Sequence, residues 1–219
     1  MLYFVKTPWL LKKFYPACIW DIPSVEKKIY LTFDDGPHQD ATPFVLDELK
    51  KHNAKATFFC IGKNVIDHPD IYKRVLNEGH RVGNHTHNHL NGWKTSDSEY
   101  CSNIEQAAKY IDSDLFRPPY GRITKFQISC LKKSSADFKI IMWDVLSADF
   151  DEKISGETCA LNVIRNTTKG SIVVFHDSGK AFSRLKIALP EILNFFGDKG
   201  YSFEALSKAS FEKNLHQYQ

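Results

Sequence analysis

The chain has 219 residues, of which 42% are hydrophobic and 25% are charged, a composition typical of one globular domain with a sizeable core. Its net charge of +3 results from 29 basic and 26 acidic residues, and no basic run is interleaved with aromatic residues, so we expect no nucleic-acid partner. The five cysteines lie far apart and form no CxxC pair, which argues against a disulfide framework and a zinc-thiolate site.

Residues 1–23 are rich in aromatic side chains, and three lysines, Lys6, Lys12 and Lys13, divide their apolar residues into short pieces. A signal peptide needs roughly 7–15 unbroken apolar residues and a membrane-spanning helix needs about 20. We therefore expect no cleavable signal peptide and no transmembrane helix, which favours a cytoplasmic location by default. We expect residues 1–23 to form an aromatic arm packed on a single domain of residues 24–219; a membrane-surface anchor is the alternative.

Apolar runs alternate with amphipathic helical patterns along the rest of the chain. The predicted strands are 28–35, 56–62, 80–86, 114–121, 139–145, 170–177 and 201–206. The predicted helices are 42–53, 68–79, 98–111, 124–133, 157–167 and 183–196. Thr42 is expected to cap the first helix with Pro43 at its first position, Gly79 to end the second, and Ser96 with Glu99 to form a capping box before the third. Seven strands alternating with helices predict an α/β fold whose parallel sheet closes into a barrel, similar to a TIM barrel.

Polar and charged residues lie at the carboxyl ends of the predicted strands or just after them. They are Asp34, Asp35, His85, His87, His89, Arg117, Tyr120, Asp144, Asp149, His176 and Asp177. In barrels of this kind the carboxyl ends of the strands carry the catalytic residues. This joint placement predicts an active site at one end of the barrel.

The segment GNHTHNH holds three histidines at a spacing of two residues. If the segment is helical, His85 and His89 share one face and His87 points elsewhere; if it is extended, all three share one face. Imidazole and carboxylate ligands suit a divalent ion such as zinc. Loop histidines that cap helices or bond to the backbone are the structural alternative.

Asp34 and Asp35 stand side by side in TFDDGP, although adjacent carboxylates repel each other. One aspartate and two neutral histidines would leave a divalent ion with a net charge of about +1 and an open position for water, as in catalytic zinc sites. We therefore expect one aspartate to bind the metal and its neighbour to act as a base. An Asp-Gly turn with solvated carboxylates would explain Asp35 and Gly36 but not Asp34.

Together these motifs resemble the polysaccharide deacetylase family (carbohydrate esterase family four, or nodulation protein B homology domain) from about Lys28 to Leu206. TFDDGP matches the first motif of the family without change, HTHNH fits the second and RPPYG fits the third. VVFHD resembles the last motif, with Val174 where the family usually has leucine. The resemblance implies a distorted seven-stranded barrel, in agreement with the strand count.

The resemblance also implies a role for each matching residue. Asp34 would be the general base, paired with Arg117 that holds it ionised. His176 would be the general acid, oriented by Asp149, and the backbone N–H of Tyr120 would help to hold the oxyanion. One divalent metal, usually zinc with Co2+, Ni2+ or Mn2+ as alternatives, would be bound by Asp35, His85 and His89.

The fourth motif departs from the family pattern, which often reads Asp-x-x-Asp-Trp. The segment LSADF places Leu146 at the first aspartate and Phe150 at the tryptophan, while Asp149 keeps the second aspartate. This departure alters the wall of the substrate groove more than the chemistry. Asp144 and Trp143 lie just upstream, where core packing is the alternative for Trp143. The residues expected to line the groove are Pro119, Tyr120, Trp143, Phe150 and Val174.

We therefore expect a metal-dependent hydrolase that removes N-acetyl groups from N-acetylglucosamine-containing glycans, either chitin oligomers or peptidoglycan. The products would be acetate and a free amino sugar. The same metal site would also serve an O-acetyl esterase acting on xylan or a hydrolase of a small cyclic amide. A non-catalytic carbohydrate-binding module is the third alternative, and the complete set of base, acid and metal residues argues against it. We expect a monomer with the acetylated glycan as its partner; because the family commonly acts on cell-wall or extracellular glycans, the cellular location is left open.

Overall fold

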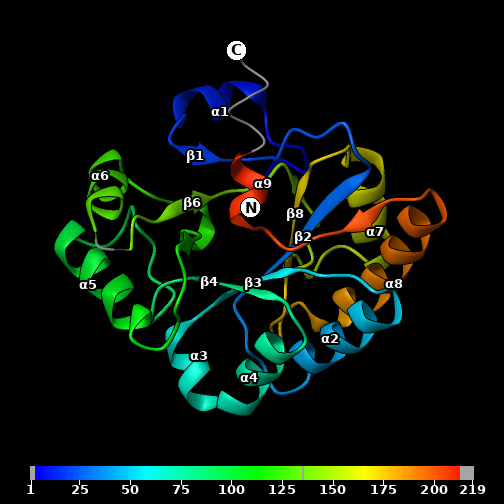
Figure 1. Cartoon of the computed structure of the whole chain (residues 1–219), viewed down its shortest axis with the longest axis horizontal. Helices are drawn as coiled ribbons and strands as arrows, with labels where there is room; N and C mark the ends of the chain where they lie inside the picture. The colour runs from blue at the N-terminus through cyan, green and yellow to red at the C-terminus, as the bar shows by residue number, and fades with distance from the viewer. Residues whose placement is uncertain (1–2, 135, 213–219) are drawn as a thin grey trace.

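The structure is a computed structural model that describes residues 3–134 and 136–212 (Figure 1). Its strands are β1 (Cys18–Ile19), β2 (Lys28–Asp34), β3 (Thr57–Cys60), β4 (Arg81–Asn84), β5 (Leu115–Phe116), β6 (Lys139–Ile141), β7 (Val145–Leu146), β8 (Ile172–His176) and β9 (Ser202–Phe203). Its helices are α1 (Trp9–Phe14), α2 (Ala41–Lys51), α3 (Gly62–Asp67), α4 (Pro69–Asn77), α5 (Asp97–Ala108), the short 3-10 turn η1 (Pro119–Gly121), α6 (Lys125–Lys133), α7 (Gly156–Asn166), α8 (Phe182–Asp198) and α9 (Lys208–Glu212).

The strands form one curled sheet in the order β1-β6-β5-β4-β3-β2-β8-β7, and β9 pairs with the beginning of β2. The named strands of the described residues pair in parallel, as strands joined by helical crossovers do. Figure 1 shows α2 to α8 arranged around the outside of the strands. The predicted α/β fold with a distorted barrel is confirmed.

The predicted strand 139–145 is in fact two strands, β6 and β7, that pair with different parts of the sheet. The N–H of Met142 donates to the carbonyl of Ile19 in β1, whereas the N–H of Asp144 donates to the carbonyl of Ile172 in β8. The chain therefore crosses between the two edges of the curled sheet within three residues. The apolar run continues through this crossing, which is why the sequence pattern indicates a single strand.

The N-terminal segment lies along the edge strand β7. The N–H of Leu146 donates to the carbonyl of Val5 at 2.8 Å, and the N–H of Thr7 donates to the carbonyl of Asp144 at 2.9 Å. An uncovered strand edge offers unpaired backbone groups to other chains, so this pairing protects the edge of the sheet.

The division into an arm of residues 1–23 and a domain of residues 24–219 stays a prediction, and positions 1–2 and 213–219 lie outside the described residues. In the described ranges, none of the helices combines the length and the apolar character needed to cross a bilayer.

Strand β2 shows how the fold directs side chains into the barrel. Leu31 and Phe33 pack against the outer helices, whereas Tyr30 belongs to the apolar cluster inside the barrel. Because side chains alternate along a strand, Thr32 and Asp34 also face the interior. The inward face of β2 therefore ends in a carboxylate at the carboxyl end of the sheet.

Helix α2 begins at Ala41, with Asp40 before it, so the prediction that Thr42 caps this helix is wrong. The hydroxyl of Thr42 accepts a hydrogen bond from the N–H of His38 at 2.8 Å and donates to Oδ2 of Asp177 at 2.5 Å. The side chain thus fastens the loop before the helix to β8, and Pro43 occupies the third helical position rather than the first.

Two other predicted helix boundaries are confirmed. Gly79 follows α4 with a φ of 76°, in the left-handed region that glycine adopts without strain. Ser96 precedes α5, and its hydroxyl accepts a hydrogen bond from the N–H of Glu99, which is one half of the predicted capping box.

Candidate metal and catalytic site

Asp34 ends β2 inside the barrel, where it meets a buried arginine. Nη1 of Arg117, which follows β5, donates to Oδ1 of Asp34 at 2.7 Å. Arg117 is 0% exposed, and Asp34 is also buried. Either charge would be costly to bury alone, so each is the counter-charge that allows the other to lie there.

The guanidinium of Arg117 is held by further contacts. It donates to Oγ1 of Thr32 at 2.7 Å and to the carbonyls of Ile141 and Met142 at 3.2 and 2.9 Å. Its central carbon lies 4.1 Å from the centroid of the Phe59 ring. Burial lowers the pKa of Arg117, with the neighbouring carboxylate opposing this, and a guanidinium stays charged at neutral pH. The orientation of the guanidinium is therefore fixed.

Asp35, His85 and His89 form a candidate metal site, and their ligand atoms all lie within 4.8 Å of one another. Oδ1 of Asp35 is 3.1 Å from Nε2 of His89 and 3.7 Å from Nε2 of His85. Asp35 follows β2, whereas both histidines follow β4. The φ of Asp35 is 81°, so the chain turns directly after Asp34 and the adjacent carboxylates do not share one direction.

The donor atoms of this cluster fit a divalent cation. Oδ1 of Asp35 is buried, and no donor among the described residues makes a hydrogen bond to it. Nδ1 of His85 lies 2.7 Å from the carbonyl oxygen of Arg117. Because a carbonyl only accepts, Nδ1 carries the proton and Nε2 keeps a free lone pair, an arrangement common in metal-binding histidines. Burial lowers the pKa of His85 to about 4, so the ring is neutral at pH 7.

The charge of Asp35 also suits a cation. Burial alone would raise the pKa of this carboxyl, but the ring nitrogen of His89 and the positive charge of His176 outweigh it and hold the pKa well below its usual range. The site therefore offers one ionised carboxylate and two imidazoles, a donor set typical of zinc.

His87 does not belong to the cluster. The segment is neither helical nor extended, because Thr86 and His89 have left-handed φ values of 65° and 56°. These two residues bring His85 and His89 together, while the ring of His87 lies 6.1 Å from that of Tyr110 in centroid distance. The pairing predicted for a helix is present, although a loop produces it.

His176 ends β8 opposite Asp34 in the strand register. Its Nδ1 lies 2.7 Å from Oδ1 of Asp149, and its N–H donates to Oδ2 of the same carboxylate at 2.8 Å. Burial by itself would lower the pKa of His176, but the buried carboxylate of Asp149 outweighs this and raises the pKa to about 10, with smaller contributions from Asp35 and Asp34. The imidazole is therefore protonated at neutral pH.

Tyr120 lies in η1 with a φ of 61°, and it is 55% exposed. Its hydroxyl is 3.1 Å from Nδ1 of His89, and the two ring centroids are 4.6 Å apart. The resemblance assigned a role only to the backbone N–H of Tyr120. The side-chain contact adds a partner for the second ring nitrogen of His89, of the kind that orients metal ligands.

The other residues predicted to line the substrate groove differ in the surface that they offer. Phe150 is half-buried, and its ring centroid lies 5.5 Å from that of His176. Trp143 is also half-buried, whereas Pro119 is buried and Val174 is only 1% exposed. Of these four side chains, Phe150 and Trp143 therefore expose the most surface to a ligand.

Asp177 holds the metal-site turn in place, a role that the sequence did not reveal. Its Oδ1 accepts a hydrogen bond from the N–H of Gly36 at 3.1 Å, and its Oδ2 accepts from the hydroxyl of Thr42 at 2.5 Å. A Cβ on Gly36 would lie 2.0 Å from Oδ2, so only glycine fits beside this carboxyl. Burial raises the pKa of Asp177 well above its usual range. The available signal was its position next to His176, at the end of a predicted strand.

Asp144 was predicted at the carboxyl ends of the strands, and this prediction is wrong. Its carboxylate accepts from Nζ of Lys6 at 2.5 Å, Nζ of Lys12 at 2.8 Å and the hydroxyl of Ser171 at 2.6 Å. Ser171 precedes β8, whereas His176 ends it, so Asp144 lies at the opposite end of the barrel. Its partners show that it fastens the N-terminal segment.

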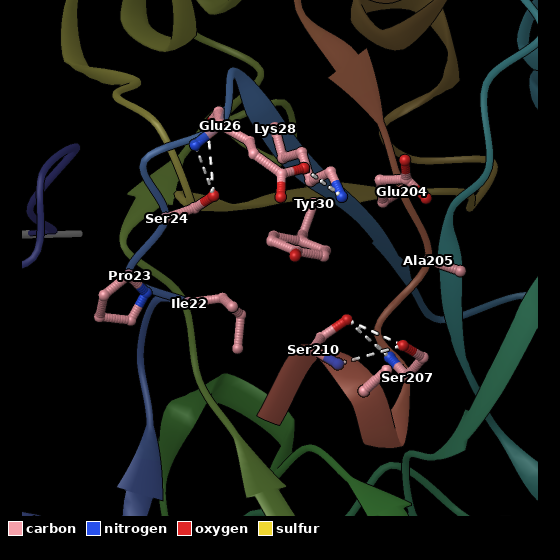
Figure 2. Close-up of a pocket in the computed structure, with 11 residues that line it drawn as sticks. Ile22, Pro23, Ser24, Glu26, Lys28, Tyr30, Glu204, Ala205, Ser207 and Ser210 are labelled. Atoms are coloured by element: carbon pink, nitrogen blue, oxygen red, sulfur yellow. Dashed lines mark hydrogen bonds and ion pairs between the residues drawn. The ribbon is translucent and has the colours of Figure 1, made fainter. Parts of the chain in front are cut away.

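A pocket of about 230 Å³ also lies at that opposite end, near the amino end of β2 (Figure 2). Its lining includes Lys28, Tyr30, Ser207 and Ser210. Lys28 begins β2 and Asp34 ends it, so the pocket is roughly 20 Å from the candidate site. The pocket and the candidate metal and catalytic site are therefore separate.

With this geometry in view, comparisons with known proteins define the class. The family model for polysaccharide deacetylase matches residues 21–137. A peptidoglycan-N-acetylglucosamine deacetylase of Bacillus cereus is 37% identical over 195 residues, which cover 86% of this chain and 91% of that protein. The peptidoglycan-N-acetylmuramic acid deacetylase PdaA of Bacillus subtilis is 32% identical, over 87% of this chain and 74% of that protein.

A solved structure supports the same class of protein. The crystal structure of the Bc1960 peptidoglycan N-acetylglucosamine deacetylase superimposes with a TM-score of 0.83 at 35% identity, covering 91% of this chain and 95% of that one. The chain therefore belongs to the polysaccharide deacetylase family. This membership confirms the predicted enzyme class, a hydrolase that acts on linear amides.

Proposed function

We propose that the chain is a metal-dependent deacetylase that removes the N-acetyl group from N-acetylglucosamine residues of peptidoglycan. The reaction cleaves the amide with water and releases acetate, leaving a free amine on the sugar. The choice of peptidoglycan over chitin rests on the similarity to the Bacillus cereus deacetylase. The choice of N-acetylglucosamine over N-acetylmuramic acid rests on the higher identity to that protein, 37% against 32%.

The observation that carries the proposal is the joint position of two ion pairs and the candidate metal site at one end of the barrel. Asp34 pairs with Arg117, His176 pairs with Asp149, and Asp35 faces the two histidines of the candidate metal site. Amide hydrolysis needs a base for water, an acid for the leaving amine and stabilisation of the oxyanion. This end of the barrel offers a group for each task.

A divalent cation held by Asp35, His85 and His89, for which zinc is our first choice, would supply Lewis-acid polarisation of the amide carbonyl. Zinc fits because the donors are one carboxylate and two imidazoles. Co2+, Ni2+ and Mn2+ accept the same ligand types and are the alternatives.

The chain's own residues would carry the protons. Asp34 takes a proton from the attacking water, and the ion pair with Arg117 holds its carboxylate in position. The backbone N–H of Tyr120 donates to the oxyanion that develops on the acetyl carbonyl. Protonated His176 donates to the nitrogen of the leaving amine, and Asp149 holds its ring in position. An amine leaves poorly as an anion, so this proton is required.

The test is acetate release from peptidoglycan and from chitin oligomers by protein stripped with a chelator, with and without added zinc. Asp34→Asn is the matched control, because it keeps the size of the side chain and removes the base. Zinc-dependent release that this variant abolishes while it still binds zinc is the expected result. Loss of zinc from the variant would contradict the division of labour between Asp34 and Asp35. Bound zinc without release from either glycan would refute N-deacetylation and favour an ester or small-amide substrate.

A further inference from the structure

Three rings from distant parts of the chain lie in a row at the carboxyl end of the barrel. The ring centroids of His176 and Phe150 are 5.5 Å apart, and those of Phe150 and Tyr3 are 5.4 Å apart. Both contacts have one ring edge against the other ring, a geometry that aromatic pairs prefer. The row therefore leads from the proposed general acid to the N-terminal segment.

The ring of Tyr3 is held in place. Its hydroxyl donates to Oδ2 of Asp151 at 2.9 Å. Two residues further along, the carbonyl of Val5 accepts a hydrogen bond from the N–H of Leu146 in β7. A ring fixed by its own hydroxyl and by the backbone beside it loses little conformational entropy when a ligand binds.

Tyr3 contacts Phe150, the residue at which the fourth motif of this chain departs from the family pattern. Phe150 stands where the family often has tryptophan, and a phenyl ring presents less apolar surface than an indole. The match to the family model begins at residue 21, so Tyr3 lies outside it. The N-terminal segment thus adds a second ring to a wall that one larger side chain would otherwise supply.

We propose that Tyr3 and Phe150 form a subsite for the sugar residue next to the one that loses its acetyl group. The inference rests on the proposed function, because it takes His176 as the group that meets the reacting residue. The C–H faces of a pyranose ring are apolar and slightly positive, so they are attracted to the negative faces of aromatic rings. The carboxylate of Asp151 lies beside the Tyr3 hydroxyl and supplies an acceptor for a sugar hydroxyl.

The first experiment measures kcat and KM for N-acetylglucosamine and its oligomers with wild type and Tyr3→Ala. For oligomers, loss of one aromatic contact should raise KM about 3- to 10-fold without changing kcat. For the single sugar, which fills only the reacting position, both constants should stay unchanged. Tyr3→Phe keeps the ring but loses the hydrogen bond to Asp151, so its KM should lie between those of Tyr3→Ala and wild type. Phe14→Ala is the matched control, because Phe14 is 63% exposed in α1 of the same segment and should have no effect.

A second measurement separates this subsite from the proposed reaction. Zinc-loaded Asp34→Asn, with and without Tyr3→Ala, is titrated with a chitin oligomer in a calorimeter, and Tyr3→Ala should raise the Kd about 3- to 10-fold. Equal Kd values, no binding by either protein, or an equal rise in KM for the single sugar and the oligomer would overturn the subsite. Wild type that releases no acetate would refute the proposed function, while the titration still decides on the subsite.

Discussion

Replacement of Asp149 by asparagine tests whether the reaction requires His176 in its protonated form. Asp149 is buried, and its two carboxylate oxygens contact Nδ1 and the N–H of His176 at 2.7 and 2.8 Å. Asparagine has nearly the same size and shape but no charge. The variant therefore removes the counter-charge of the imidazolium with little change in packing.

The expected effect follows from the pKa of His176, which lies at about 10 instead of its ordinary 6.5. Burial favours the neutral ring, so the charge of Asp149 must outweigh burial to give this value. Removing one partner of a buried ion pair costs roughly 3–5 kcal/mol, and one pKa unit corresponds to about 1.4 kcal/mol. We therefore expect Asp149→Asn to lower the pKa of His176 by about 2 units or more.

The sign of the effect on activity is fixed by the role of the proton. A general acid works only below its pKa, so the fall in kcat/KM at high pH should begin about 2 units lower in Asp149→Asn than in wild type. Well below the lowered pKa, His176 is again protonated and the variant should regain much of its activity. A bound cation lowers the pKa of His176 in both proteins, so the difference between the two profiles is the quantity to compare.

The assay is acetate release from a chitin oligomer by zinc-loaded protein across the pH range. Glu152→Gln is the matched control, because it also changes a carboxylate to an amide but lies exposed on the same loop. Coincident high-pH limbs for Asp149→Asn and wild type would refute the reasoning. A uniform loss at every pH without a shift would assign Asp149 a structural role only.

The structure supports three further predictions. Arg117→Met should lower the free energy of unfolding by about 3–5 kcal/mol in a urea titration, because the buried carboxylate of Asp34 loses its counter-charge; a change below about 1 kcal/mol would contradict this. Gly36→Ala should lower the free energy of unfolding by about 1–3 kcal/mol and weaken zinc binding, because the new Cβ collides with the carboxyl of Asp177. His87→Ala should keep a full equivalent of zinc in metal analysis, because its ring lies outside the candidate site; zinc loss would mean that the histidine assignment is wrong.

The Gly36→Ala prediction has a matched control within the chain. Gly197 lies in α8, and a Cβ there would meet no atom within 4 Å. Gly197→Ala should therefore be neutral or stabilising by up to about 1 kcal/mol, because alanine favours a helix. Equal effects of the two substitutions would show that the contact with Asp177 does not limit residue 36.

The features that the sequence predicted are local ones. The family, the alternation of strands and helices, and the placement of Asp34 at the carboxyl end of a strand follow from sequence motifs and from the periodicity of the apolar residues. The feature that local patterns did not decide is the conformation of residues 85–89. This conformation depends on the positive φ values of Thr86 and His89. Glycine is the residue type from which a positive φ can be predicted reliably, and neither residue is a glycine.

The errors concern contacts between residues far apart in the chain. The apolar run at 139–145 predicts one strand, but its two halves pair with strands that other segments supply. Asp144 lies within the same segment, so its predicted position is wrong for the same reason. Asp177 and Gly36 are 141 residues apart, so neither indicates the other in a single sequence. Such long-range contacts depend on the packing of the whole fold rather than on the local propensities of the residues.

The two adjacent aspartates of TFDDGP serve different cations in the proposed mechanism. Asp34 faces Arg117, whereas the left-handed turn at Asp35 directs its carboxylate to the metal site. With Asp149 and protonated His176 included, three carboxylates and two cationic side chains leave a charge of about −1, which a divalent cation would change to about +1. A neutral acetamide gains less from this charge than the oxyanion that forms from it. The site would therefore stabilise the transition state more than the substrate, which is the condition for catalysis.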